Sequence, residues 1–260
     1  CLATSRHLPS DVGVLINAGV HRDKHTCEPA MACYIQHRLG INVEFQGRPT
    51  VAFDLQNGGV GMLSAVHVLA AMIESSDVQT GMVVASEVNC DRHPDPRYMY
   101  PPSGAAALLD VAPRAGVGFG AFVFETRLDR AGMYTSTVSL AEKRGRILLE
   151  RATELEEAYL DGCGRVVEEL LAREHLRRAD VDLVVPAQIS ARFLSRLPDV
   201  IFFPREAVLD LSGGLADTLS TSVFLGLHQA LQDRLLGPAK VALLLACGSG
   251  ITVGAATYRF

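Results

Sequence analysis

The sequence predicts an α/β protein folded from two similar halves. Short, β-branched apolar runs alternate with segments of helical spacing, and four such elements recur in the same order in both halves. Apolar residues make up 48% of the 260 residues and charged residues 20%, the balance expected of a globular chain with a sizeable core. A duplicated set of strand–helix units predicts two α/β lobes stacked about a pseudo-twofold axis.

The first half contains five expected strands and two expected helices. The strands are 11–17, 50–55, 81–86, 105–111 and 116–125, and the helices are 28–39 and 61–73. The run 11–17 is almost wholly apolar, as a strand buried on both faces of a parallel sheet would be. Gly40 follows the first helix as a stop signal. We expect 105–111 and 116–125 to form an antiparallel pair.

The second half repeats this order after a linker expected at 126–139. The charged segment 140–178 is expected to form one or two amphipathic helices. The further elements are a strand at 181–186, helices at 190–197 and 221–235, a glycine-rich turn at 212–214, and strands at 241–246 and 251–259. We therefore expect an N-terminal lobe at 1–128 and a C-terminal lobe at 129–260.

Composition excludes several classes of function. The net charge is −5 with no Lys/Arg-rich run, so no nucleic-acid partner is expected. No apolar stretch reaches the ~20 residues of a membrane span, and no signal peptide is recognisable. The six cysteines are scattered without a CxxC pair, which favours a reducing cytoplasm and argues against a metal site or disulfide framework.

The first twelve residues, CLATSRHLPSDV, have the pattern of a helix end, a proline-containing turn and a strand start. This opening is typical of a chain that begins partway through a fold. We therefore expect the sequence to be a fragment of a longer fold.

Five motifs, in this order, resemble one known family. They are EPAMACYIQHRLG (28–40), FDLQNGGVGMLSAV (53–66), VVPAQIS (184–190), DTLSTSVFLGL (217–227) and LLLACGSGITVGAA (243–256). Together they resemble beta-ketoacyl-acyl-carrier-protein synthase III, of the thiolase superfamily, from about residue 11 to the C-terminus. The resemblance implies a thiolase-like, five-layered sandwich, and a role in fatty acid, polyketide or related metabolism. Because that family begins with a further strand and helix, it also implies that the first strand and helix of the fold are missing from this sequence.

The resemblance also locates the three catalytic positions of that family. Its nucleophilic cysteine falls on Gly59, its histidine on Ala187 and its asparagine on Asp217. Condensation needs a thiolate to accept the acyl group and neutral donors to stabilise an enolate. None of the three residues supplies these groups, so ordinary condensation is not expected. Backbone N–H groups at Gly59 and Gly248 remain as oxyanion donors.

Other residues are candidates for a remaining role. Cys247 is either a substitute nucleophile beside the glycine-rich turn or a small residue that fills the core. Asp217 is either a general base with a raised pKa or a helix N-cap. The resemblance places Arg92 and Arg97 in a loop over the substrate, where they would meet a CoA or phosphopantetheine phosphate, unless this is a plain surface loop.

Two further features have structural interpretations. Glu87 ends an expected strand, and we read it as a structural acid. The HRDKH segment (21–25) lacks ligand spacing for a metal, so we expect a solvated loop.

Three functions remain open. The first is a non-catalytic or tunnel-shaping subunit, forming a homodimer or a heterodimer with an active ketosynthase-like chain through the strand 81–86. The second is an acyltransferase or thioester-processing enzyme with an altered site. The third is an acyl- or CoA-binding protein. No bound cofactor is expected; acyl-CoA or the phosphopantetheine of an acyl carrier protein is the expected ligand, and that carrier protein a possible partner.

Overall fold

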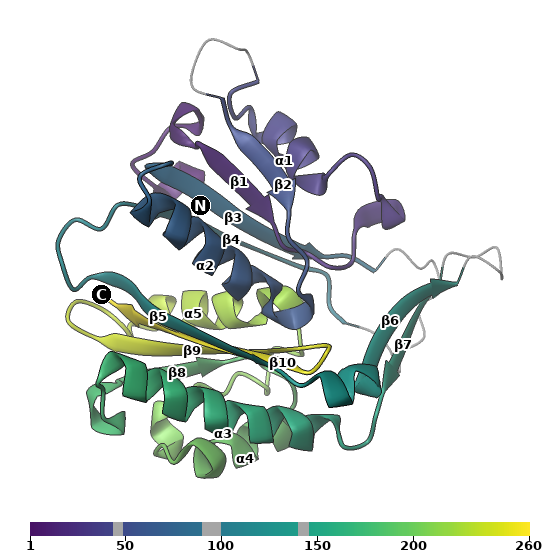
Figure 1. Cartoon of the computed structure of the whole chain (residues 1–260), viewed down its shortest axis with the longest axis vertical. Helices are drawn as coiled ribbons and strands as arrows, with labels where there is room; N and C mark the ends of the chain where they lie inside the picture. The colour runs from purple at the N-terminus through teal and green to yellow at the C-terminus, as the bar shows by residue number, and fades with distance from the viewer. Residues whose placement is uncertain (44–48, 90–99, 140–145) are drawn as a thin grey trace.

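Two four-stranded sheets and three helical layers form a five-layered sandwich in the computed structural model, which describes residues 1–43, 49–89, 100–139 and 146–260 (Figure 1). Sheet A has the strand order β2-β1-β3-β4, and sheet B the order β5-β10-β9-β8. The strands of sheet A are β1 Val14–Asn17, β2 Val51–Asp54, β3 Thr80–Glu87 and β4 Ser103–Asp110. The strands of sheet B are β5 Gly118–Thr126, β8 Leu183–Pro186, β9 Val241–Gly248 and β10 Thr252–Arg259.

Helices cover both faces of each sheet. In Figure 1, α1 (Met31–Leu39) lies on the outer face of sheet A, and α2 (Gly61–Glu74) and α5 (Ser222–Gln232) lie between the sheets. The outer face of sheet B is covered by α3 (Leu155–Glu174) and α4 (Ala191–Ile201). Among the described helices, none has the length and apolarity needed to cross a membrane.

The strand β1 shows how the sequence pattern produces these layers. All four of its residues are buried, as the apolar run predicts. Side chains alternate between the two faces of a strand. Leu15 therefore packs with Ala32 and Ile41 under α1, whereas Val14 and Ile16 join the core between the sheets. Full burial of such a side chain contributes roughly 1.5–3 kcal/mol.

The internal repeat is present in the strand pairing. In sheet A, β1 and β3 are parallel and β3 and β4 antiparallel. In sheet B, β8 and β9 are parallel and β9 and β10 antiparallel. The two sheets thus repeat the same three-strand unit, which confirms the duplication seen in the sequence.

Two of the sequence predictions about pairing are wrong. β4 and β5 do not pair with each other: β4 pairs with β3, and β5 crosses to sheet B and pairs with β10. The second wrong prediction is that a second chain pairs with the strand 81–86. This strand is β3, and it has hydrogen-bonded neighbours on both sides, β1 and β4. Its edges are therefore not available to a second chain, and within the described residues β2 is the outer strand at that side of sheet A.

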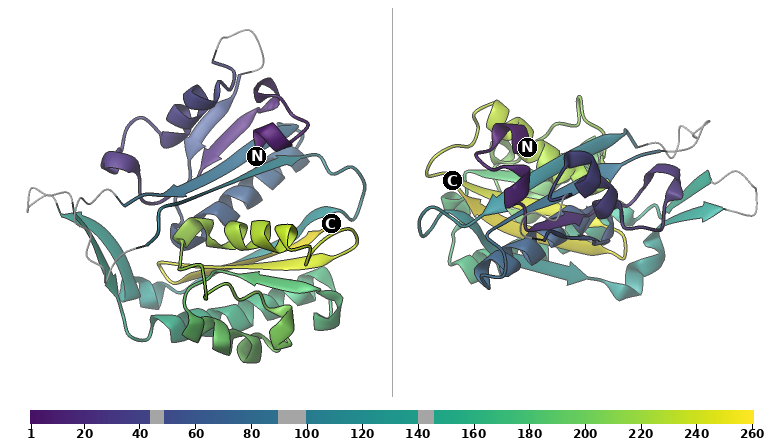
Figure 2. Two further views of the ribbon diagram at one scale, coloured as in Figure 1. Left: turned by 180° about the vertical axis from the view of Figure 1, so that it is seen from behind. Right: turned by 90° about the horizontal axis from the view of Figure 1, so that it is seen from above.

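The segment expected to be a linker and the start of a helix contains a β-hairpin. A 3₁₀ segment, Leu128–Met133, leads into β6 (Tyr134–Ser139), which pairs antiparallel with β7 (Arg146–Arg151). In β7, Ile147 and Leu149 are buried and Leu148 is exposed, so its period is that of a strand and not of a helix. Figure 2 shows the hairpin curving along one side of the molecule.

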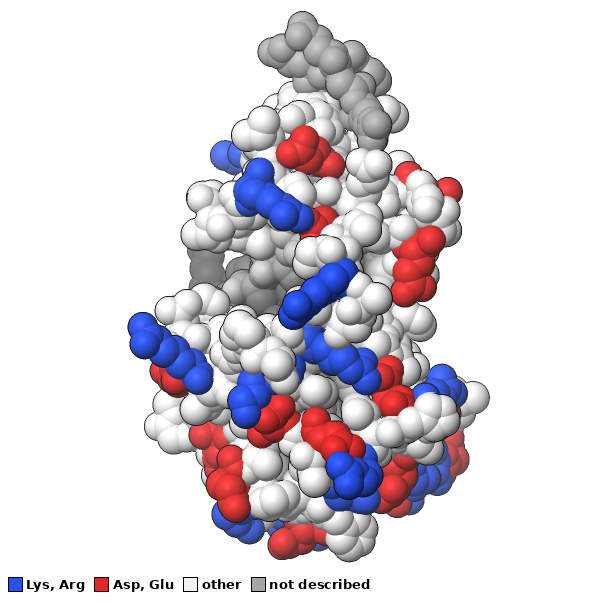
Figure 3. Space-filling model, turned by 90° about the vertical axis from the view of Figure 1, so that its left-hand side faces the viewer, with Lys and Arg blue, Asp and Glu red and all other residues white. Residues whose placement is uncertain are grey.

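Charges of both signs share the surface. On the face drawn in Figure 3, Lys and Arg side chains stand beside Asp and Glu side chains. Ion pairs join some of the described charges, such as Arg165 on α3 with Glu125 on β5 at 2.8 Å. The visible face therefore has no patch of a single sign.

Candidate active site

Three segments that are far apart in the sequence meet between the two sheets. The 3₁₀ turn Gly58–Val60, which precedes α2, contacts both the end of β9 and the 3₁₀ turn Leu219–Thr221, which precedes α5. These segments carry or adjoin Gly59, Asp217 and Cys247. The topology therefore brings together positions that the family resemblance singled out.

Gly59 has no room for a side chain. A Cβ atom built on it would lie 2.3 Å from the carbonyl oxygen of Cys247. The converse holds at Gly248, where a Cβ would lie 2.9 Å from the nitrogen of Gly59 and 2.8 Å from Cγ2 of Val60. The two backbones pack directly against each other, so any side chain at position 59 requires the backbone to shift.

Ala187 directly follows β8 and is buried, with 2% of its surface exposed. Its N–H donates to the carbonyl oxygen of Leu245 at 2.8 Å, and its methyl side chain offers no donor. The neighbouring Gln188 is also buried, but its amide serves the backbone: its Oε1 accepts from the N–H of Leu211 at 2.7 Å. Neither residue presents a side-chain donor for an enolate oxygen.

Asp217 is not the N-cap residue of either helix that follows it: Thr218 precedes the 3₁₀ turn Leu219–Thr221 and Thr221 precedes α5. A general-base role stays a prediction. Oδ1 of Asp217 accepts from the N–H of Leu219 at 2.9 Å, which fixes the start of the 3₁₀ turn Leu219–Thr221. Burial raises the pKa of this carboxyl to about 6, although the Leu219 hydrogen bond and Arg151 act in the opposite direction. The group is therefore mostly ionised at pH 7 and would repel a developing enolate.

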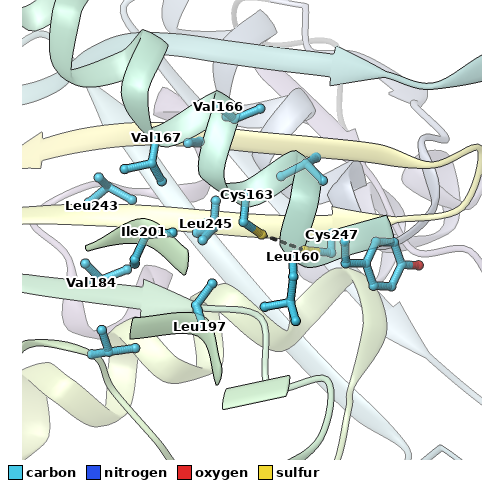
Figure 4. Packing of buried hydrophobic residues seen from close by; sticks show 14 of the residues in the cluster. Leu160, Cys163, Val166, Val167, Val184, Leu197, Ile201, Leu243, Leu245 and Cys247 are labelled. Atoms are coloured by element: carbon cyan, nitrogen blue, oxygen red, sulfur yellow. Dashed lines mark hydrogen bonds between the residues drawn. The ribbon is translucent and has the colours of Figure 1, made fainter. Parts of the chain in front are cut away.

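Cys247 lies in the core. Its Sγ is 3.7 Å from Sγ of Cys163 on α3, and only 4% of Cys247 is exposed (Figure 4). Its side chain packs with Leu160, Leu197 and Leu245 in the layer between sheet B and the outer helices. The hydrogen bond with Cys163 and burial raise the pKa of Cys247 well above its ordinary value. The thiol is thus protonated at neutral pH, and it is a poor nucleophile in that form.

The hairpin adds two residues to this region that the sequence reasoning missed. The guanidinium carbon of Arg151 lies 5.1 Å from the ring centroid of Tyr134, and its charge also lowers the pKa of Asp217. The alternation of buried and exposed residues in β7 is the sequence signal for Arg151, whereas the charged pattern of 140–178 predicts a helix there. Arg92 and Arg97 lie outside the described residues.

A second polar cluster adjoins the first. Glu87, at the end of β3, is fully buried, and its carboxylate accepts from the N–H of Val20 at 3.2 Å and of His21 at 3.0 Å. Ser220 donates its hydroxyl to the same carboxylate. His21 is only 7% exposed, so the expectation of a solvated loop at 21–25 is wrong for this residue. The ring of His21 points toward the buried carboxylate of Glu87, because its Nδ1 lies 2.8 Å from Oε2.

No group of three or more His, Cys, Asp or Glu side chains in the described part of the chain has the arrangement of a metal site.

Comparison with known proteins places this chain beside the synthase III proteins. The family model for the C-terminal part of 3-oxoacyl-[acyl-carrier-protein] synthase III matches residues 171–260. The beta-ketoacyl-[acyl-carrier-protein] synthase III of Methylococcus capsulatus is 25% identical over 97% of this chain and 78% of its own length. The corresponding protein of Escherichia coli O1:K1 is 28% identical over 89% of this chain and 73% of its own.

Solved structures give the same fold. A crystal structure of 3-oxoacyl-(acyl-carrier-protein) synthase III matches with a TM-score of 0.85 at 19% identity, covering 100% of this chain and 81% of that one. A variant of OleA from Xanthomonas campestris, with bound lauric acid and lauroyl-CoA, matches with a TM-score of 0.85 at 15% identity, covering 100% and 79%. This chain is therefore similar to beta-ketoacyl-[acyl-carrier-protein] synthase III proteins along nearly its whole length, its residues 171–260 match the C-terminal part of that family, and it has the thiolase fold.

Proposed function

We propose that this chain is a synthase III-like protein of fatty acid or polyketide-type metabolism that does not condense acyl groups by the cysteine mechanism. In this proposal it acts as a non-catalytic or tunnel-shaping subunit. The observation that carries the proposal is the packing of Gly59, where the carbonyl of Cys247 occupies the space that a nucleophilic side chain would need.

The two other positions support the same conclusion. A decarboxylating condensation develops negative charge on an enolate oxygen, which neutral hydrogen-bond donors stabilise. Ala187 has no side-chain donor, and Asp217 with a pKa of about 6 presents mostly a negative charge at neutral pH. Both replacements act against the transition state of condensation.

A partner chain is part of the proposal. The outer strand β2 is short and ends at Asp54, and Val51 is 55% exposed. Unpaired strand edges are commonly covered by another strand or chain. We therefore assign the pairing edge to β2, in place of the strand 81–86, in a homodimer or a heterodimer with an active ketosynthase-like subunit.

The ligand of the proposed subunit is an acyl chain carried as a thioester on CoA or on the phosphopantetheine of an acyl carrier protein. The support is similarity of fold: the OleA variant with the same fold has bound lauric acid and lauroyl-CoA. In a tunnel-shaping role, this chain would contact the acyl chain without forming a bond to it.

The test is a condensation assay on the protein in its native oligomer, with acyl-CoA and malonyl-acyl-carrier-protein as substrates. We expect no β-ketoacyl product from this chain alone. We expect product when an active ketosynthase-like subunit is present, with a chain-length preference that changes on removal of this chain. A β-ketoacyl product formed by this chain alone would overturn the proposal.

A further inference from the structure

A serine, a histidine and a glutamate from three segments that are distant in the sequence are joined by a chain of two hydrogen bonds. Oγ of Ser136 on β6 lies 2.9 Å from Nε2 of His21, in the loop after β1. Nδ1 of the same ring lies 2.8 Å from Oε2 of Glu87 at the end of β3. Serine oxygen to Nε2 and Nδ1 to carboxylate is the order of contacts in a serine-nucleophile triad.

The other partners of Glu87 fix the direction of these hydrogen bonds. The N–H groups of Val20 and His21 and the hydroxyl of Ser220 all donate to its carboxylate. A carboxylate that accepts from so many donors also accepts from the ring, so the proton of His21 lies on Nδ1. In the neutral ring with this tautomer, Nε2 is the acceptor for the hydroxyl group of Ser136.

The nucleophile is accessible and the base is shielded. Ser136 is exposed, whereas His21 is 7% exposed and Glu87 not at all. The ring of His21 also stacks on Tyr100 at a centroid distance of 4.5 Å. Packing and hydrogen bonds therefore hold the imidazole in one orientation before any substrate arrives, as a preorganised site requires.

Attachment of the hairpin does not by itself account for this arrangement. Ile147 and Leu149 of β7 already pack with Tyr100 and Leu219 in an apolar cluster. Burying a histidine and a carboxylate carries a desolvation cost that apolar residues of similar size would avoid. The apolar contacts already hold the hairpin in place. The hydrogen bonds that join Ser136, His21 and Glu87 therefore contribute little to its attachment.

We propose that Ser136 is the nucleophile of an acyl-transfer site for acyl thioesters, the ligand class of the proposed function on which this substrate rests, with His21 as general base and Glu87 as the positioning residue. Oγ of Ser136 attacks the thioester carbonyl carbon while Nε2 of His21 takes the hydroxyl proton. The C–S bond breaks, and the leaving thiolate receives that proton from His21, leaving an acyl ester on Ser136. Water, activated by the same histidine, then hydrolyses the ester to a free acid.

This activity is separate from the proposed role as a non-condensing subunit and uses none of Gly59, Ala187 and Asp217. Its products are a free acid and a free thiol, whereas condensation gives a β-ketoacyl thioester. The two proposals are therefore tested by different products. Absence of the free acid and free thiol counts only against the serine site, and formation of a β-ketoacyl thioester by this chain alone counts only against the non-condensing role.

The first experiment treats the purified protein, in the oligomeric state in which it is isolated, with a fluorophosphonate, which reacts with activated serines. We expect one adduct per chain, mapped by peptide mass spectrometry to Ser136, and its loss in Ser136→Ala. The matched control is Ser195→Ala, which removes an exposed serine whose hydroxyl donates to the carbonyl of Arg192. This control should label as the unmodified protein does.

The second experiment measures thiol release from butyryl-CoA. We expect Ser136→Ala to lower the rate at least about 100-fold, the scale of a lost general acid–base and nucleophilic pair. Glu87→Gln should lower kcat with little change in KM, because it affects the orientation of His21 and not substrate binding. Ser136 is exposed and its variant is expected to fold, so that variant decides the outcome. Absence of labelling, labelling at another residue, or equal thiol release by Ser136→Ala would overturn the proposal.

Discussion

The carbonyl oxygen of Cys247 occupies the place of a side chain on Gly59: a Cβ there would be 2.3 Å away. This contact joins the turn before α2 to the end of β9. The glycine is therefore required by the packing of these two backbones, and we expect a cysteine placed there to displace one of them.

The variant Gly59→Cys tests this contact. We expect it to lower the free energy of unfolding by about 1–3 kcal/mol, the usual cost of overpacking a filled core. We also expect no β-ketoacyl product. Urea denaturation and the condensation assay measure the two effects, with Gly213→Ala as control because nothing lies within 4 Å of a Cβ at that turn position. A Gly59→Cys protein as stable as the parent would contradict the crowding.

Asp217→Asn tests the half-buried carboxyl whose pKa is raised. Its pKa is raised from 3.8 to about 6, mainly by burial, so the folded state prefers the protonated form. A raised carboxyl pKa makes stability fall as pH rises, with the loss beginning above the unfolded value and complete above the folded one. Asn keeps an oxygen that can accept from Leu219 and cannot ionise.

The stability of the parent relative to Asp217→Asn should therefore decline by roughly 1 kcal/mol between pH 5 and pH 8, since one pKa unit is about 1.4 kcal/mol. Chemical denaturation of both proteins at several pH values gives this difference directly. A gap that does not vary with pH, or that varies in the opposite direction, would show that Asp217 titrates as an ordinary carboxyl.

The buried cysteines should resist alkylation. Cys163 and Cys247 are buried, and the pKa of Cys247 is raised well above its ordinary value. We expect iodoacetamide to modify the exposed Cys1, Cys27 and Cys33 in the native protein, and to reach the buried pair only after denaturation. Peptide mass spectrometry with and without guanidinium measures this. Rapid modification of Cys247 in the native state would contradict this expectation and would support Cys247 as a substitute nucleophile.

Two neighbouring leucines test the hairpin. Leu149 is 2% exposed and Leu148 is 44% exposed, as expected for adjacent residues on opposite faces of β7. Leu149→Ala should cost about 2–5 kcal/mol of unfolding free energy, the range for buried Leu-to-Ala changes, and Leu148→Ala far less. Thermal and urea unfolding of the pair provide the comparison. Equal effects would mean that the segment is not held as a strand against the core.

Local sequence patterns located most of the regular elements. The apolar run at 11–17 predicted β1, Gly40 marked the end of α1 with a φ of 67°, and the repeat predicted two matching sheets. These features depend on neighbours within a few residues or on the alternation of one strand, so they are readable without the fold. The resemblance likewise located the three altered positions, because each is a matter of residue identity.

Tertiary structure decided which strands pair and which polar groups meet. The sequence of β5 does not specify whether its neighbour is β4, nearby in the chain, or β10, more than a hundred residues away. Ser136 and His21 are separated by 115 positions, and neither has a distinctive local motif. Such contacts depend on how whole layers pack, since hydrophobic alternation marks the face of a strand but not its partner. The sequence alone therefore determined most of the regular elements, and the packing of the two lobes determined the hydrogen bonds that join Ser136, His21 and Glu87.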